Sequence, residues 1–403
     1  MPSIANRAFC FVSPCNLEKN MKKTLLAASL LGAFAVSAQA QSSVTLYGTL
    51  DAGLVYSNNQ LGHSNFQQGS GSLSTTLFGV RGNEDLGGGL HAIFTLESGF
   101  NLNNGAFKEN GTMFNRQAYV GLKSDQYGQI TLGRQYDSMV DYLAPISAAG
   151  YGYGNNLAAH PFDNDNLDGT FSVKNSVKYT SANYNGIQFG GLYGFSNAAG
   201  QFSNNRAWSA GASYQNGPLN VAASYLQLNN SGSNNTGGAV SFGNGDANIA
   251  AALQRTYGAG ANYTYGPATV GFVYTHTQLD NVQGINVGGT VIGGIGGTNL
   301  HMDNYELNGR YALTPALSLA AAYTFTDGKV TGSNGTGDPK WQTASLQGDY
   351  ALSKRTDVYL EGVYQHASGQ LGSLGANVAA INTLSPSSTA NQTAVTIGMR
   401  HRF

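Results

Sequence analysis

From Val44 to the final residue, the chain consists of short segments in which apolar and polar residues alternate, separated by glycine, proline and asparagine. Alternation with a period of two places successive side chains on opposite faces of an extended strand. About sixteen such segments can be counted, near 44–57, 73–83, 90–101, 112–124, 128–137, 171–182, 186–196, 206–215, 219–228, 254–265, 268–279, 303–313, 316–326, 340–352, 356–366 and 392–403. The pattern predicts an all-β protein.

The connections between these segments alternate between short and long. Short connections such as Asn216–Pro218 contain two or three turn residues. The long connections are polar and lie at 57–72, 138–170, 229–253, 280–302 and 367–391. Short periplasmic turns and long extracellular loops are typical of an antiparallel barrel that spans the outer membrane, and such barrels have an even number of strands. The sequence therefore predicts a transmembrane antiparallel β-barrel of about 16 strands.

The composition agrees with a surface that meets lipid. Charged residues make up 10% of the chain, against about 25% in ordinary soluble domains. The 20 Lys and Arg residues nearly balance the 21 Asp and Glu residues, which gives a net charge of −1. This balance does not match a nucleic-acid-binding protein, for which a strongly basic surface would be expected.

The period of two also assigns the faces of individual strands. In 303–313, Leu307 falls on one face, whereas Glu306 and Arg310 fall on the other. In 356–366, Leu360 and Glu361 divide in the same way. Because the apolar face of a membrane barrel meets lipid and the polar face meets water, we expect Glu306, Arg310 and Glu361 to face the lumen.

The N-terminal region carries an export signal. Residues 21–40 begin with a methionine and two lysines, continue with an apolar run and end with small residues, which is the order found in a secretory signal peptide. We interpret 1–20 as a mis-assigned N-terminal extension upstream of the true start. The exported protein is then expected to be 41–403, folded as one barrel.

Several blocks of the chain resemble the general Gram-negative outer-membrane porins of the β-proteobacterial type. The blocks are Val44–Gly48, Phe78–Leu90, Arg116–Leu122, Thr131–Tyr136 and Asn175–Tyr179, together with an aromatic residue at the end of the chain. The resemblance covers the whole exported part. It implies a sixteen-stranded barrel that assembles as a homotrimer, with a third extracellular loop folded into the lumen. It also implies passive diffusion of small hydrophilic solutes and ions, with no cofactor.

The same resemblance implies where the protein resides and what it contacts. It places the protein in the outer membrane, in contact with membrane lipid and lipopolysaccharide, after delivery by the barrel-assembly machinery. The terminal Phe403, at the end of an amphipathic strand, resembles the assembly signal of outer-membrane barrels.

Selectivity in this family depends on basic residues of the wall that oppose acidic residues of the third loop. Arg116 matches one such wall position, and strand parity predicts that Arg81 and Lys174 also point into the lumen. Leu77 and Ser172 stand where relatives commonly have arginine, so the full row of basic residues is not present.

The acidic side of the constriction is predicted to come from the longest connection, 138–170. Its candidate residues are Asp141, Asp163, Asp165 and Asp168. The run from Asp163 to Gly169 also resembles a calcium loop, but a leucine occupies a ligand position and no later glutamate completes the set. A metal site is therefore not predicted, and a solvated loop remains the alternative to a pore-lining role.

Arg134 differs from the other basic residues because it shares the parity of Leu132 and should point out of the barrel. A cation that faces lipid is costly unless it lies near the interface. We hypothesise that Arg134 pairs with Glu109 in the second extracellular loop of a neighbouring subunit.

Three other functions compete with that of a diffusion channel. A barrel enzyme would carry a nucleophile and its base at the rim, and the sequence shows no motif such as Gly-x-Ser-x-Gly in a strand–turn–helix setting. The histidines are scattered without metal-ligand spacing. A surface adhesin or receptor and a substrate-specific channel remain alternatives, the latter distinguished by saturable transport.

Overall fold

The computed structural model describes residues 42–150, 153–233, 235, 237–243, 246–333, 335–372 and 377–403. The proposed extension 1–20 and signal peptide 21–40 lie outside the described residues. Over the described ranges, no helix has the length and apolar character needed to cross a membrane.

The described residues form seventeen strands in one antiparallel sheet. The strands are β1 (Ser43–Gln60), β2 (His63–Ser70), β3 (Leu77–Gly87), β4 (Leu90–Gly99), β5 (Gln117–Ser124), β6 (Gly128–Gln135), β7 (Val173–Thr180), β8 (Ile187–Gly194), β9 (Arg206–Asn216), β10 (Leu219–Asn229), β11 (Ile249–Tyr265), β12 (Ala268–Val287), β13 (Thr290–Ala312), β14 (Leu317–Gly332), β15 (Lys340–Ala351), β16 (Thr356–Ser368) and β17 (Asn391–Arg402).

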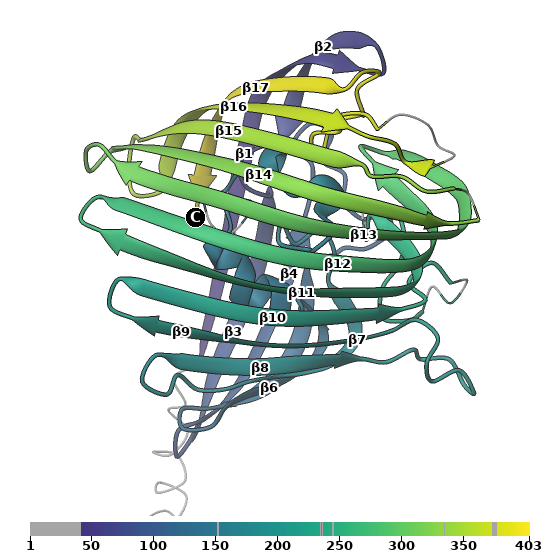
Figure 1. The fold of residues 1–403 in the computed structure, drawn as a ribbon. Helices are drawn as coiled ribbons and strands as arrows, with labels where there is room; N and C mark the ends of the chain where they lie inside the picture. The colour runs from purple at the N-terminus through teal and green to yellow at the C-terminus, as the bar shows by residue number, and fades with distance from the viewer. Residues whose placement is uncertain are drawn as a thin grey trace, which may run out of the picture.

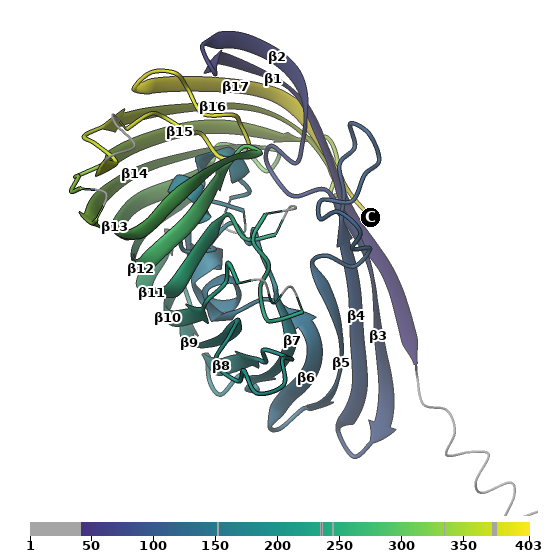
Figure 2. The same ribbon diagram turned by 90° about the vertical axis from the view of Figure 1, so that its right-hand side faces the viewer.

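The sheet closes on itself because β1 pairs with the last strand. Thr49 lies opposite Arg402, and Ser57 lies opposite Ala394. On its other edge, β1 pairs with β3 through its first half and with β2 through its second half. The strands β2 and β3 thus occupy one position of a closed 16-strand barrel, as predicted (Figures 1 and 2).

The two faces of the barrel differ as the alternation predicts. On the outer face, Leu307 is 56% exposed and Leu360 is 58% exposed. Their inward-facing neighbours Glu306 and Glu361 are buried. The inner side chains are buried because a long connection covers part of the lumen wall.

That connection, which we call loop 3, is formed by 136–172 between β6 and β7. Its described residues contain four short helical turns, η1 (Met139–Leu143), η2 (Ala144–Ile146), η3 (Asn156–Ala158) and η4 (Pro161–Asp163). Figure 2 shows these turns inside the ring of strands. The prediction that the third loop folds into the lumen is confirmed.

Loop 3 lies against the wall because its apolar side chains fit over small wall residues. Leu143 is fully buried in a cluster with Leu226 and Val273 of β10 and β12. A Cβ added to Gly258 of β11 would come within 2.8 Å of a terminal methyl group of Leu143. The absence of a side chain on this glycine therefore makes room for the loop.

Two stretches that the sequence suggested as loops are largely strand. Within 57–72, β1 extends to Gln60 and β2 follows after a two-residue turn. Within 280–302, β12 and β13 extend to a turn formed by Gly288 and Gly289, whose φ angles are 53° and 86°. Two glycines with positive φ suit a tight hairpin turn, whereas the polar composition had suggested a loop.

The end of the chain is fixed on the first strand. The Phe403 N–H donates to the Gly48 carbonyl and the Gly48 N–H donates to the Phe403 carbonyl, each at 3.1 Å. A Cβ on Gly48 would come within 2.5 Å of the Phe403 ring. The glycine therefore provides the surface on which the terminal aromatic ring packs.

We predict that Gly48→Ala destabilises barrel closure by about 1–3 kcal/mol, because the added methyl group displaces the Phe403 ring. The measurement is the urea midpoint of the barrel refolded in detergent. Gly362→Ala is the matched control, since a Cβ at Gly362 meets nothing within 4 Å. Equal stability of the two variants would contradict the packing argument.

Candidate functional site

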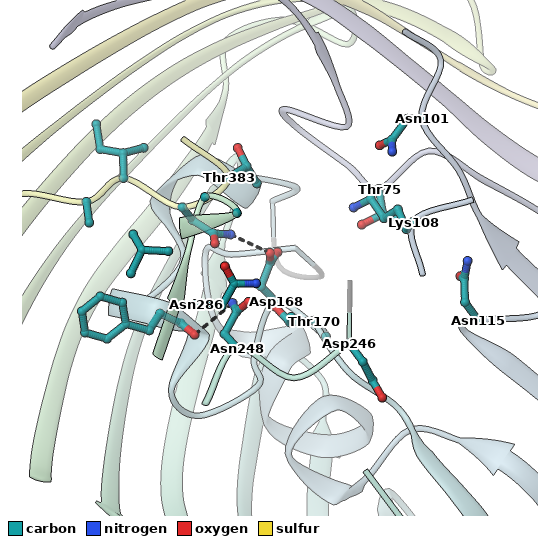
Figure 3. Close-up of a pocket in the computed structure, with 18 of the residues that line it drawn as sticks. Thr75, Asn101, Lys108, Asn115, Asp168, Thr170, Asp246, Asn248, Asn286 and Thr383 are labelled. Atoms are coloured by element: carbon teal, nitrogen blue, oxygen red, sulfur yellow. Dashed lines mark hydrogen bonds between the residues drawn. The ribbon is translucent and has the colours of Figure 1, made fainter. Parts of the chain in front are cut away.

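A cavity of about 470 Å³ lies in the lumen next to loop 3. Figure 3 shows residues of its lining from two sides, with Thr75, Lys108 and Asn115 facing Asp168 and Asn286 across the open space. The first group comes from the β2–β3 connection and the loop between β4 and β5. The second comes from loop 3 and the end of β12. The cavity is therefore a constriction between the loops and the wall.

Opposite charges face each other across this constriction. Lys108 stands on one side, and Asp168 stands on the other, where its Oδ2 accepts a hydrogen bond of 2.9 Å from Asn382. Burial and the charge of Asp163 raise the pKa of Asp168 well above its usual range, against the attraction of Lys108. A solute passing here meets a transverse electric field. The sequence prediction did not include Lys108. This residue lies in an irregular loop, where the alternation of faces along a strand cannot assign the direction of a side chain.

Arg116 lines the same cavity, but an acidic residue offsets part of its charge. Its Nε donates to Glu97 Oε1 at 2.8 Å, and its guanidinium lies over the ring of Tyr136 at 5.3 Å from the centroid. Tyr47 also donates to Glu97, at 2.9 Å. Arg116 therefore contributes shape and a half-neutralised charge, while Arg81 stays exposed on the inner face over the Tyr47 ring.

The parity used for Lys174 does not hold in the structure. Gln135 lies opposite Val173 and Gly133 lies opposite Ser176, so β7 contains an extra residue at this point. Asn175 takes up the irregularity with a φ of 51°. Such a β-bulge re-aims the neighbouring side chains.

As a consequence, Lys174 does not point from the wall into the lumen. Its Nζ bonds Ser241 Oγ and lies 3.4 Å from Asp246 Oδ2 in the connection between β10 and β11. Lys174 therefore holds this connection and neutralises Asp246, which lines the constriction.

Of the four acids predicted in loop 3, only Asp168 reaches the cavity lining. Asp163 closes a turn, since its carboxylate accepts from the backbone N–H groups of Asp168 and Thr170 at 3.0 and 3.1 Å. Asp141 pairs with Lys178 of β7 at 2.8 Å. Among the described residues, no group of three or more metal-ligating side chains forms a metal site.

The remaining acid, Asp165, belongs to a clamp that the sequence did not reveal. His160 lies between two carboxylates, with Nδ1 at 2.6 Å from Asp165 Oδ2 and Nε2 at 3.1 Å from Glu306 Oε2. Glu306 also accepts from the Ala148 N–H at 2.8 Å. The predicted lumen residue Glu306 thus anchors loop 3 to β13, and solutes cannot reach it because it is buried.

Arg134 forms its ion pair inside one subunit. Its Nη1 lies 2.7 Å from Glu109 Oε2 of the same chain, and its Nε donates to Ser172 Oγ at 2.6 Å. Asp246 lies 3.3 Å from Nη2. The partner residue in the hypothesis is found, but its assignment to a neighbouring subunit is corrected. The strand pattern predicts that Arg134 points outward, but its side chain is only 8% exposed because loops of its own chain cover it.

The last two predicted lumen residues lie apart from the constriction. Arg310 is exposed at the far end of β13, where its Nη2 donates to Ser318 Oγ at 3.1 Å. Glu361 is buried on the inner face of β16, between Gln347 and Thr396 of the adjacent strands.

These observations define a membrane barrel with a charged, water-accessible constriction. The Gram-negative porin family model matches residues 27–370, and the chain belongs to this family. An outer membrane porin protein of Bordetella pertussis is 36% identical over 418 residues, covering 95% of this chain and all of that protein. Outer membrane porin protein 32 of Delftia acidovorans is 33% identical over 218 residues, covering 51% of this chain and 60% of that protein.

A solved structure agrees with the family assignment. The anion-selective porin from Comamonas acidovorans superposes with a TM-score of 0.67 at 25% identity, covering 90% of this chain and all of that one. The protein is thus an outer-membrane channel through which solutes diffuse passively.

We predict that the loop 3 clamp depends on the protonation of His160. Burial opposes its charge, but Asp165 and Glu306 outweigh burial and raise the pKa from 6.5 to about 10. A raised pKa gives stability that is complete below pH 6.5 and is lost as the pH rises through about 10. His160→Asn should therefore cost roughly 3 kcal/mol at pH 7 and nearly nothing at pH 11.

The measurement is the free energy of unfolding of both proteins in detergent between pH 7 and pH 11. Other groups titrate in this range, so the difference between wild type and His160→Asn isolates the clamp. A difference that stays constant over the whole range would rule out a charged His160.

Proposed function

We propose that the channel has a weak preference for anions, set by Lys108 against Asp168. The single observation that carries this proposal is the pair of opposed charges across the constriction. The solved relative from Comamonas acidovorans is described as anion-selective, which supports the direction of the preference.

The preference is weak because most other charges at the constriction are paired. Arg116 is balanced by Glu97, and Asp246 lies near both Arg134 and Lys174. In the described part of the chain, Lys108 makes no ion pair within 4 Å, and the carboxylate of Asp168 bonds only the amide of Asn382.

The ionisation of Asp168 adjusts this preference. Because its pKa is raised, a larger fraction of Asp168 is neutral at a given pH than for an ordinary carboxyl group. When Asp168 is neutral, Lys108 dominates the field and anions are favoured. When Asp168 ionises at higher pH, the two charges offset each other and the preference declines. Burial and the charge of Arg116 lower the pKa of Lys108, which acts in the same direction.

We also infer the assembly and contacts of the protein. The outer face of β1 exposes Val44, Leu46 and Leu54 at 69%, 61% and 68%, which suits contact with lipid or with another subunit. This supports a homotrimer embedded among outer-membrane lipid and lipopolysaccharide. The position of Phe403 on the closing strand supports its role as an assembly signal read by the barrel-assembly machinery. Transport of this kind needs no catalytic step, and we propose that the protein is not an enzyme.

We predict opposite effects for substitutions of the two opposed residues. Lys108→Gln should lower the ratio of chloride to potassium permeability by about threefold, because one unscreened charge at the constriction contributes roughly 0.7 kcal/mol. Asp168→Asn should raise that ratio at high pH and reduce its pH dependence. The measurement is the reversal potential in a planar bilayer under a gradient of potassium chloride.

Lys329→Gln serves as the matched control, because it removes the same charge from an exposed residue on the outer face of β14. If Lys108→Gln and Lys329→Gln shift the reversal potential equally, the constriction does not set the selectivity and the proposal is wrong.

A further inference from the structure

A second cavity lies on the opposite side of loop 3 from the constriction. Its volume is about 560 Å³, and it shares no lining residue with the first cavity. Gly150, Tyr153 and Gly154 of loop 3 cover it on one side. The short turns after β11, β13 and β15 border it on the other side. It is therefore a vestibule at the periplasmic end of the lumen, since short turns face the periplasm.

The vestibule has an excess of positive charge among its described lining residues. Four basic side chains line it, together with only two acidic ones. The basic residues are Arg310, Lys354, Arg400 and Arg402, and the acidic residues are Asp349 and Asp357.

The two acids are already paired. Arg400 lies 2.8 Å from Asp349 and 3.1 Å from Asp357. Arg402 lies 2.6 Å from the other oxygen of Asp357. These contacts fix β15, β16 and β17 to one another on the inner face, and they leave the charges of Arg310 and Lys354 unmatched.

Arg310 and Lys354 are not accounted for by the stability of the barrel. Among the described residues, the Arg310 side chain donates a hydrogen bond only to the neutral hydroxyl of Ser318, and it is exposed. Lys354 is exposed in the turn between β15 and β16 and forms no ion pair with the described residues. Unmatched charges of one sign in a single cavity repel one another, so they favour a bound counter-ion.

The spacing of these residues indicates the kind of anion. Adjacent strands lie roughly 4.8 Å apart, and the basic residues stand on β13, on the β15–β16 turn and on β17. A single chloride ion carries one negative charge, whereas Arg310 and Lys354 together leave two positive charges unmatched. A small anion with two or more charged groups can contact several of them at once.

We propose that the periplasmic vestibule is a binding site for small multivalent anions, such as di- and tricarboxylates, with Arg310 and Lys354 as its recognition residues. The inference rests on the channel function, but it does not depend on the anion preference of the constriction. An anion held in the vestibule obstructs the passage of chloride, so binding can be read as a loss of conductance. An anionic solute that crosses the channel then meets the constriction on one side of loop 3 and the vestibule on the other, one after the other.

The test uses citrate as the probe and full-length barrels in a planar bilayer with potassium chloride. The orientation of each inserted protein is read from a biotin label on Ala199→Cys in the β8–β9 loop, which binds streptavidin in only one chamber. Citrate added to the periplasmic chamber should reduce the chloride conductance of the wild type in a concentration-dependent way. The double variant with Arg310→Gln and Lys354→Gln should need about fivefold more citrate for the same reduction.

Two comparisons decide the result. Lys108→Gln should shift the reversal potential but leave the periplasmic citrate effect unchanged, so that a failure of the constriction proposal is distinguished from a failure of this one. Raising the potassium chloride concentration should weaken the citrate effect, because salt screens the charges. Equal citrate concentrations for wild type and the double variant, or an equal effect from both chambers, would overturn the proposal.

Discussion

The structure depends on the closure of backbone hydrogen bonds into a ring. In the hydrocarbon core of a membrane, an unpaired backbone N–H or carbonyl costs several kcal/mol, so a sheet with a free edge is excluded. Here β1 supplies both edges of the closure, with β17 on one side and with β2 and β3 on the other. The packing of Phe403 on Gly48 belongs to this seam. Because the ring is closed, the polar faces of all strands must enclose water or be covered from within.

Loop 3 covers part of that inner face and thereby determines the pore. Its apolar residues pack over small residues of β10 to β12, as Leu143 does over Gly258. Its polar residues are held at a few points, above all by His160 between Asp165 and Glu306. The loop thus occupies one side of the lumen. The charges that remain accessible to solutes lie at the constriction on one side of the loop and in the periplasmic vestibule on the other.

The sequence predicted the barrel because the period of two and the turn residues are local patterns. A strand that faces lipid on one side and water on the other requires this alternation along its length. It failed where the backbone leaves this period. Lys174 lies directly before a β-bulge at Asn175, and a parity argument cannot detect the extra residue. For Arg134, parity could not reveal the pairing with Glu109 of the same chain, because parity says nothing about the loops that cover a side chain. The clamp of His160 joins residues that are 146 positions apart, so no local pattern reveals it.

The distribution of paired and unpaired charges explains why counting basic residues predicts selectivity poorly. Arg116 and Lys174 were expected to attract anions, yet each stands beside a carboxylate that takes up most of its field. An ion in the lumen responds to the net charge within roughly a Debye length, about 8 Å at physiological ionic strength. Among the described residues, Lys108 on one side of loop 3 and Arg310 on the other form no ion pair within 4 Å, and we propose that on this scale they outweigh the paired residues. On this proposal, the selectivity of the barrel depends on which basic residues the fold leaves without an acidic partner.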